Sequence, residues 1–297
     1  MGGPAIMLPT IREAIASMEA VIAGSVESVS AADTGLFGPE SVSWRICREP
    51  AYAISAIAGL LMGAIHPVAM AAIDQHSDYR RDAWRRAHRT TRYVFTITFG
   101  STATALRAAG QVRTIHERIA GEDPITGIRY RADDPELLLW IHCVNTRMAL
   151  SGQNAFGRPL TATDEDRYVA EQVKAAALVG LTGPRVPATR AELDRRLGEV
   201  RPLTLSPAAK QFADLLLRAR MPWTMRPFWA LHVAGALMIL PREVHALYGF
   251  PERLPRGPLA RRAIRAILKA MDLAYAAFPP IRRARRHLRL IQAAARS

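Results

Sequence analysis

The segment AYAISAIAGLLMGAIHPVAMAAI, residues 51–73, decides what kind of fold this chain adopts. It contains no charged residue, and as a helix it is long enough to cross about 30 Å of hydrocarbon. However, it is built largely of Ala and Gly, and His66 followed by Pro67 interrupts it. Proline removes a backbone donor and bends or ends a helix, while histidine is costly in lipid. We therefore expect a buried helix that bends at His66, with a membrane span as the alternative.

Helical periodicity dominates the sequence on both sides of this segment, and runs of alternating β-branched residues are scarce. The acidic pair Asp133 and Asp134, followed by Pro135, is a strong start signal for a helix. A second signal, TRAELDRRLGEV at residues 189–200, predicts a short exposed helix. We see no internal repeat. The sequence thus predicts an all-α fold, a single-domain helical bundle.

The composition is strongly basic, with a formal net charge of +14 over 297 residues. Arginine carries almost all of it, and much of the excess lies in the C-terminal segment. Clustered cations favour nucleic acid or an anionic membrane surface, and the simpler alternative is a solvated, arginine-rich surface. No zinc-finger spacing, RNA-recognition signature or glycine-rich phosphate loop is present, so we expect no nucleic-acid partner. Peripheral membrane contact through the C-terminal basic helix remains an expectation.

The two cysteines, Cys47 and Cys143, form neither a CxxC pair nor a disulfide framework, which suits a reducing compartment. The N-terminus lacks a basic region followed by an apolar run and a cleavage site, so it does not read as a secretory signal. We therefore expect a cytoplasmic protein.

His116 is the first candidate for chemistry. Val112, Ile115, His116 and Ile119 stand at i, i+3, i+4 and i+7, so on a helix they form one apolar stripe that faces the core. One interpretation is a neutral imidazole bonded to a backbone carbonyl. The other is an axial ligand to a metal or haem, for which a neutral imidazole on a rigid helix is well suited.

Arg86, Arg89 and Thr90 form a second candidate group, in the sequence RAHRT. Their spacing places two guanidinium groups and a hydroxyl on one helix face. This group is either a solvated basic face or a polar cluster that binds the carboxylates of a cofactor or steadies a developing oxyanion.

The remaining histidines of interest are His66, His76 and His142. With nearby carboxylates they could form a non-haem metal site, but no pair has the HxH or HExxH spacing that would be specific. His76 reads better as a capping or loop residue. The chain has no GxSxG elbow, no Walker loop and no GxGxxG after a strand, which argues against acyl transfer, nucleotide hydrolysis and dinucleotide chemistry.

Taken together, these segments resemble a known family. The order RAHRT followed about one helix later by VRTIHERI resembles the catalytic domain shared by bacterial rubber oxygenases (latex-clearing proteins) and the oxygenases of the fungal mycophenolic-acid pathway. LFGPESVSWRICREPA, AIHPVAMAAIDQHSDYRRDAWRR, TFGSTATA and DPITGIRYRADDPELLLWIH look like its actinobacterial branch, long catalogued as a domain of unknown function. The resemblance covers roughly residues 36–180.

The resemblance implies a globin-like helical core that holds haem b, with dioxygen chemistry at the iron. His116 matches the proximal iron ligand, and Arg86 and Thr90 match an arginine and a threonine of the haem pocket. Arg89 stands where rubber oxygenases carry a lysine that can approach the iron. A guanidinium is a poor iron ligand. We therefore do not expect a resting state in which the side chain at position 89 binds the iron. His66, His76 and His142 have no assigned counterpart, and any one of them could lie on the distal side; His66 and His142 are retained as candidates for cofactor binding.

These inferences combine into a prediction of function. We expect an N-terminal helical extension (residues 1–35), an oxygenase-like helical catalytic domain (36–250) and a basic C-terminal helical tail (251–297). The predicted activity is that of a haem b-dependent oxygenase, with Arg86 and Thr90 orienting the haem or polarising dioxygen. Because polyisoprene is an insoluble extracellular polymer, a small apolar or lipid-like substrate fits better. The alternative is a non-catalytic helical protein that binds haem or lipid.

Overall fold

The computed structural model describes residues 32–200, 203–219, 223–250 and 257–276, together with Ser25, Val29 and Ser30. Most of them are helical, and the sheet among them is a single two-stranded hairpin. The first half of the chain contains α2 (Val42–Cys47), α3 (Ala51–Ala64), α4 (Pro67–His76), α5 (Tyr79–Phe99), α6 (Thr102–Glu117), β1 (Ala120–Glu122) and β2 (Arg129–Arg131). The second half contains α7 (Pro135–Phe156), α8 (Ala162–Leu178), α9 (Arg190–Glu199), α10 (Pro207–Leu217), α11 (Arg226–Ile239), α12 (Arg242–Tyr248) and α13 (Pro258–Ala276).

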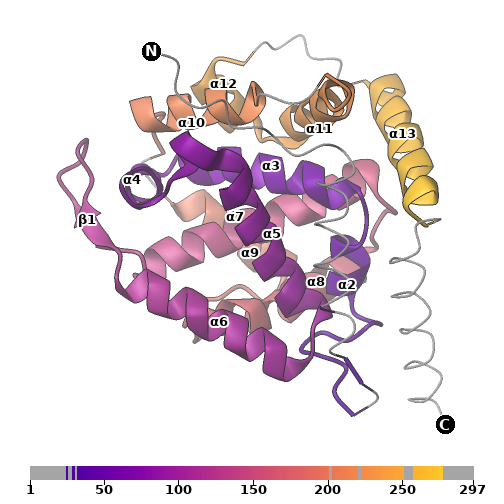
Figure 1. The fold of residues 1–297 in the computed structure, drawn as a ribbon, viewed down its shortest axis with the longest axis horizontal. Coiled ribbons are helices and arrows are strands. Elements are labelled where there is room, and N and C mark those ends of the chain that lie inside the picture. The colour runs from indigo at the N-terminus through magenta and orange to yellow at the C-terminus, as the bar shows by residue number, and fades with distance from the viewer. Residues whose placement is uncertain are drawn as a thin grey trace.

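This arrangement confirms the prediction of an all-α, single-domain fold. The residues expected to form the N-terminal helical extension lie largely outside the described residues, as does the basic tail beyond residue 276. Figure 1 shows α3 and α7 crossing the middle of the molecule, with α5 in front of them, α6 along one side, α10 to α12 along the opposite side and α13 at the edge.

The apolar segment at residues 51–73 forms two buried helices with a sharp bend between them. α3 ends at Ala64, and α4 begins at Pro67 with His66 as its N-cap. No single helix among the described residues is long and apolar enough to cross a membrane; only α3 and α4 taken as a pair would pass, and they are bent by 105°. Most side chains of α3 are buried inside the protein. The prediction of a buried helix that bends at His66 is confirmed.

α7 is the helix around which the others pack, since it contacts α3, α8, α9, α11 and α13. It begins where the sequence predicts, because Asp134 caps the backbone N–H of Glu136 at 2.8 Å and Pro135 occupies the first turn. α3 lies very close to it: a side chain at Gly59 would collide with Asn145. The indole N–H of Trp140 on α7 donates to the carbonyl of Gly63 at 3.1 Å.

The short helix predicted at residues 189–200 is also present, as α9. Thr189 and Glu192 form a reciprocal capping box at its start. However, α9 is not simply an exposed helix, because Leu193 is completely buried and α9 packs against α7 and α8. The short sequence pattern identified the helix but not its packed face.

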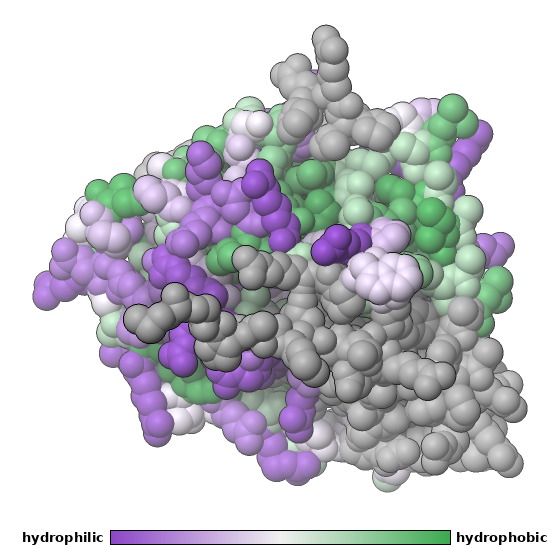
Figure 2. Space-filling view, turned by 45° about the horizontal axis from the view of Figure 1, so that its top comes forward, coloured by the Kyte–Doolittle hydropathy of each residue, from purple (hydrophilic) through white to green (hydrophobic). Residues whose placement is uncertain are grey.

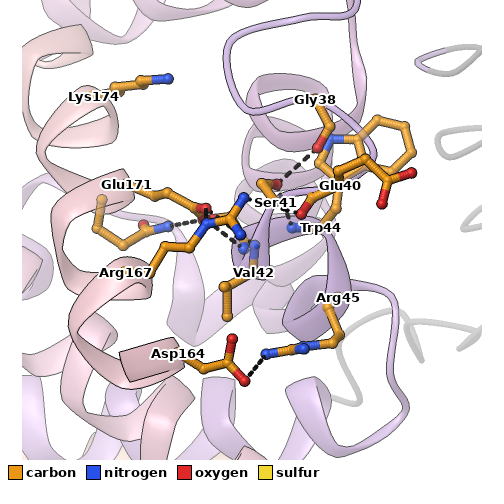
Figure 3. A network of polar contacts seen from close by, with 12 residues as sticks. Gly38, Glu40, Ser41, Val42, Trp44, Arg45, Asp164, Arg167, Glu171 and Lys174 are labelled. Atoms are coloured by element: carbon orange, nitrogen blue, oxygen red, sulfur yellow. Dashed lines mark hydrogen bonds and ion pairs between the residues drawn. The ribbon is translucent and has the colours of Figure 1, made fainter. Parts of the chain in front are cut away.

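α2 is held against α8 by one carboxylate. Glu171 accepts hydrogen bonds from the backbone N–H of Val42 at 3.1 Å and from the backbone N–H of Ser43 at 2.8 Å. It also accepts from the Ser43 hydroxyl at 2.8 Å and pairs with Arg167 at 3.1 Å (Figure 3). This clamp fixes α2 to α8, and both helices pack against α7 in one apolar cluster.

Candidate functional site

α6 brings His116 to its penultimate position, where the imidazole is half-buried. Val112 and Ile119 are half-buried with it, but Ile115 is 57% exposed, so the predicted four-residue apolar stripe is wrong at that position. Successive residues of a helix are turned by about 100°. The side chain of Ile115 is therefore turned about 100° from that of His116, whereas Val112 and Ile119 lie on the same side of the helix as His116.

The imidazole of His116 makes no hydrogen bond with the described residues. Its Nδ1 is buried without a partner, so the interpretation of an imidazole bonded to a backbone carbonyl finds no such bond. Burial lowers the pKa of His116, and the nearby charge of Asp133 opposes that shift. A neutral imidazole with a free nitrogen is the form that ligates a metal.

α5 carries Arg86, Arg89 and Thr90, and the two arginines have different surroundings in the structure. Helical geometry is broken at Asp82, one turn before Arg86. Asp78, at the beginning of α5, forms ion pairs with Arg85 and with Arg89, the latter at 3.0 Å. Arg89 is therefore exposed and ion-paired, as in the alternative of a solvated basic face, and its part in a cofactor site stays a prediction.

Arg86 is different from its neighbours. Its guanidinium lies 5.9 Å from the centre of the Phe212 ring and makes no hydrogen bond or ion pair with the described residues. Burial lowers its pKa, and the charge of Arg89 lowers it further. The guanidinium still remains charged. A half-buried cation without an anionic partner is suited to binding a carboxylate of a ligand.

Thr90 and Tyr93 extend the same face of α5, at i+4 and i+7 from Arg86. Thr90 is exposed, and its hydroxyl donates to the carbonyl of Arg86 at 3.2 Å. The hydroxyl of Tyr93 is buried without a hydrogen-bond partner, and burial raises its pKa to about 12. Tyr93 was missed from the sequence, although continuing the Arg86–Thr90 spacing by one more step would have found it.

The three other histidines do not form a site together. His66 is committed to α4, because its Nδ1 accepts the backbone N–H of Ala69 at 3.3 Å. His76 is exposed at the end of α4, as expected for a capping or loop residue. Within the described part of the chain, no group of three or more His, Cys, Asp or Glu side chains could hold a metal ion. The alternative of a non-haem metal site thus has no ligand set in these residues.

His142 on α7 has the properties that His66 and His76 lack. Its Nε2 is buried without a hydrogen-bond partner, and burial lowers its pKa to about 4. The imidazole is therefore neutral at physiological pH. Among the candidates for a second cofactor-binding histidine, His142 is the one whose ring nitrogen is buried and unused.

The three consecutive helices α5, α6 and α7 thus each carry a buried polar atom without a partner, on Tyr93, His116 and His142. Each such atom costs about 1–3 kcal/mol unless a ligand satisfies it. Haem needs from the protein an imidazole and a cation near its carboxylates, since the porphyrin supplies the other four nitrogen ligands. Neutral imidazoles and Arg86 are groups of these kinds, so the chemical types of these side chains match those that haem needs.

A separate apolar cavity of about 380 Å³ lies between α10 and α11. It contains none of the site residues described above. Its lining is apolar except for one arginine: Leu217, Ala219, Arg226, Trp229, Ala230, Val233, Ala234 and Leu237. The cavity is suited to an apolar molecule rather than to polar chemistry.

Comparison with known proteins gives one match. Residues 44–273 match the family model described as ER-bound oxygenase mpaB/B'/Rubber oxygenase, catalytic domain. The match includes every site residue described above and extends well past residue 180, where the resemblance seen in the sequence ended. No curated protein and no solved structure matches the chain, so the globin-like character of the core stays a prediction.

Proposed function

The chain belongs to the family of ER-bound oxygenases mpaB/B' and rubber oxygenases, and on that premise we propose that it is a haem b-dependent oxygenase acting with dioxygen on a small apolar or lipid-like substrate. The observation that carries the haem assignment is the state of His116. It is neutral, desolvated and without a hydrogen bond, and it lies in the motif that resembles the proximal ligand. When bound, haem b would supply an iron centre for the reaction with dioxygen.

The residues around His116 have separate roles in this proposal. His116 would hold the haem iron through its imidazole, and Arg86 would bind a haem carboxylate with its guanidinium, which forms no ion pair with the described residues. Thr90 would orient the haem by turning its hydroxyl from the carbonyl of Arg86 to donate to a haem carboxylate. The hydroxyl of Tyr93 and the Nε2 of His142, both buried without a partner, would each form a hydrogen bond with the bound haem or substrate. Arg89 would stay with Asp78 and outside this chemistry.

Two features support an apolar substrate. The buried helix α3 and the buried residues 67–71 of α4 carry no charged side chain, and the cavity between α10 and α11 has a lining that is apolar except for Arg226. Apolar walls exclude water and favour a substrate of the same character. We further propose that the protein is cytoplasmic and is in peripheral contact with a membrane surface, where it would meet a lipid-like substrate.

A haem-binding experiment tests the proposal. The full chain is produced with haem supplied, and its absorption spectrum is compared with those of His116→Ala and of His76→Ala, which removes an exposed histidine. We expect a Soret band in the wild type and in His76→Ala and its loss or a marked shift in His116→Ala. A wild type without a Soret band, or one unchanged by His116→Ala, contradicts the haem assignment. A Soret band with no oxygen uptake in the presence of any apolar substrate would favour the non-catalytic haem-binding alternative.

A further inference from the structure

Helix α13 has two apolar faces, although packing requires only one. Ile264 and Leu268 are buried against the core. On the opposite side, Leu259 and Leu273 are 77% and 65% exposed. Exposed alanines stand between these two leucines, and the resulting set recurs every three or four residues along one side: Leu259, Ala263, Ala266, Ala270 and Leu273. We call this set the outer face of α13.

The outer face lies at the edge of the molecule. Figure 1 shows α13 beyond α11, away from the middle of the fold, and in Figure 2 apolar residues gather along the same end of the molecule. Ile267, 43% exposed, widens the face on one side. Isolated apolar residues on a surface are ordinary, but a continuous apolar face marks an interaction site.

Cations border the outer face. Arg262 and Lys269 are exposed and stand three or four residues from members of the face. Asp272 is the sole acidic residue of α13. An exposed apolar face with cations along its border is the pattern of a helix that lies in the plane of a membrane interface.

Arg265 does not border the outer face, because it binds α13 to α7. Its guanidinium donates to the carbonyls of Ala155 at 2.7 Å and Asn154 at 3.0 Å, in the last turn of α7. The inner apolar residues and this contact together determine which side of α13 points outward. The outer face is therefore presented by the folded protein and does not depend on the helix leaving the body.

We propose that the outer face of α13 docks on an anionic lipid bilayer. Leu259, Leu273 and Ile267 enter the boundary between headgroups and acyl chains, and Arg262 and Lys269 contact the anionic headgroups. This inference names the surface for the membrane contact proposed above, and it rests on the proposed function only for its biological setting. A second copy of the chain fits the face less well, because two α13 helices would bring rows of cations together in a protein of net charge +14.

Vesicle binding tests the proposal. The full chain is sedimented with vesicles of phosphatidylcholine alone or of phosphatidylcholine with phosphatidylserine. We expect binding to the mixed vesicles and a loss of at least about tenfold in the partition coefficient for Leu259→Ser/Leu273→Ser. Arg262→Gln/Lys269→Gln should lose about fivefold for each charge removed. The control is Ile125→Ser/Ile128→Ser, which removes two half-exposed isoleucines from the hairpin loop and should bind as the wild type does.

Three outcomes overturn the proposal. The wild type does not bind the mixed vesicles; the Leu259→Ser/Leu273→Ser variant binds as well as the wild type, which assigns the binding to another part of the chain; or the wild type is a dimer that this variant dissociates without a change in vesicle binding. The haem spectrum of each variant is recorded in parallel. We expect it to be unchanged, so a failure of membrane docking is distinguishable from a failure of the haem assignment.

Discussion

Asp78 and Arg89 form an ion pair across 3.0 Å between the beginning of α5 and its third turn. The same carboxylate pairs with Arg85. Asp78 therefore forms ion pairs with the arginines on either side of Arg86, whereas its charge acts on Arg86 only from a distance, without an ion pair. This division leaves Arg86 half-buried beside Phe212 without an ion pair, whereas Arg85 and Arg89 are exposed and paired.

Arg86 and Arg89 should consequently respond differently to the same substitution. We expect Arg86→Gln to weaken haem binding by about tenfold, the equivalent of about 1.4 kcal/mol, because a carboxylate loses a charge-assisted partner. Arg89→Gln is the matched control and should change haem affinity by less than about twofold, since it breaks only an exposed pair. Titration of the cofactor-free protein with haem measures both. Equal losses in the two variants would mean that the pairing of Arg89 with Asp78 does not remove it from the site.

We expect His142 to lower the stability of the haem-free protein and to contribute to haem binding. Its buried Nε2 has no partner in the described structure, so replacing the imidazole by a side chain of similar size without polar atoms removes an unsatisfied group. We expect His142→Leu to raise the free energy of unfolding of the haem-free protein by about 1 kcal/mol and to weaken haem binding. Urea unfolding and haem titration measure the two effects. His76→Leu, at an exposed position, should change neither; a destabilised His142→Leu would show that the nitrogen is satisfied.

The pH dependence of stability follows from the same residue. Burial lowers the pKa of His142 in the folded protein from 6.5 to about 4. Between these values the unfolded chain binds a proton that the folded protein does not, so stability is complete above about pH 6.5 and falls as the pH decreases towards 4. The loss attributable to His142 is on the order of 3 kcal/mol. Urea unfolding at pH 7, 6 and 5 should show a smaller loss in His142→Leu, and an identical slope in both proteins would contradict the assignment.

The parts of the fold that were predicted from sequence depend on local backbone chemistry. His66 and Pro67 end one helix and begin the next because proline lacks a donor, and Asp134 with Pro135 begins α7 for the same kind of local reason. Long-range pairings have no such signal. The bond between Glu171 and Ser43 joins residues on two separate helices, and nothing in either neighbourhood of the sequence indicates the other.

The site was predicted unevenly for a related reason. His116 and Arg86 were identified by spacing, and the structure leaves the Nδ1 of His116 without a hydrogen bond and places Arg86 beside Phe212 without an ion pair. Spacing alone could not show that Asp78 takes Arg89, because the break at Asp82 changes how the first turn of α5 meets the rest. Spacing also made His66 and His142 equal candidates for cofactor binding. Only the three-dimensional structure shows that the Nδ1 of His66 already accepts a hydrogen bond, whereas the Nε2 of His142 does not.

His66 offers a test of its capping role. Its Nδ1 accepts the backbone N–H of Ala69 at 3.3 Å, which requires a neutral ring, and burial lowers the pKa of His66 and so favours that form. We expect His66→Ala to reduce the free energy of unfolding by about 1 kcal/mol, as for other lost N-caps. His66→Asn provides a capping oxygen and should recover most of that loss in urea unfolding. If asparagine is no better than alanine, the contribution of His66 comes from its packing beside Trp140.

The clamp between α8 and α2 allows the contribution of a carboxylate to be separated from that of an ion pair. Glu171 accepts three hydrogen bonds from Val42 and Ser43, and its partner Arg167 is exposed (Figure 3). Glu171→Gln keeps the shape but removes the charge and one acceptor oxygen, so we expect a loss of about 1–2 kcal/mol in the free energy of unfolding. Arg167→Gln leaves the backbone contacts intact and should cost less than about 0.5 kcal/mol. Urea unfolding of both variants decides between them: an equal cost would assign the stabilisation to the ion pair, and a larger cost for Glu171→Gln assigns it to the contacts with α2.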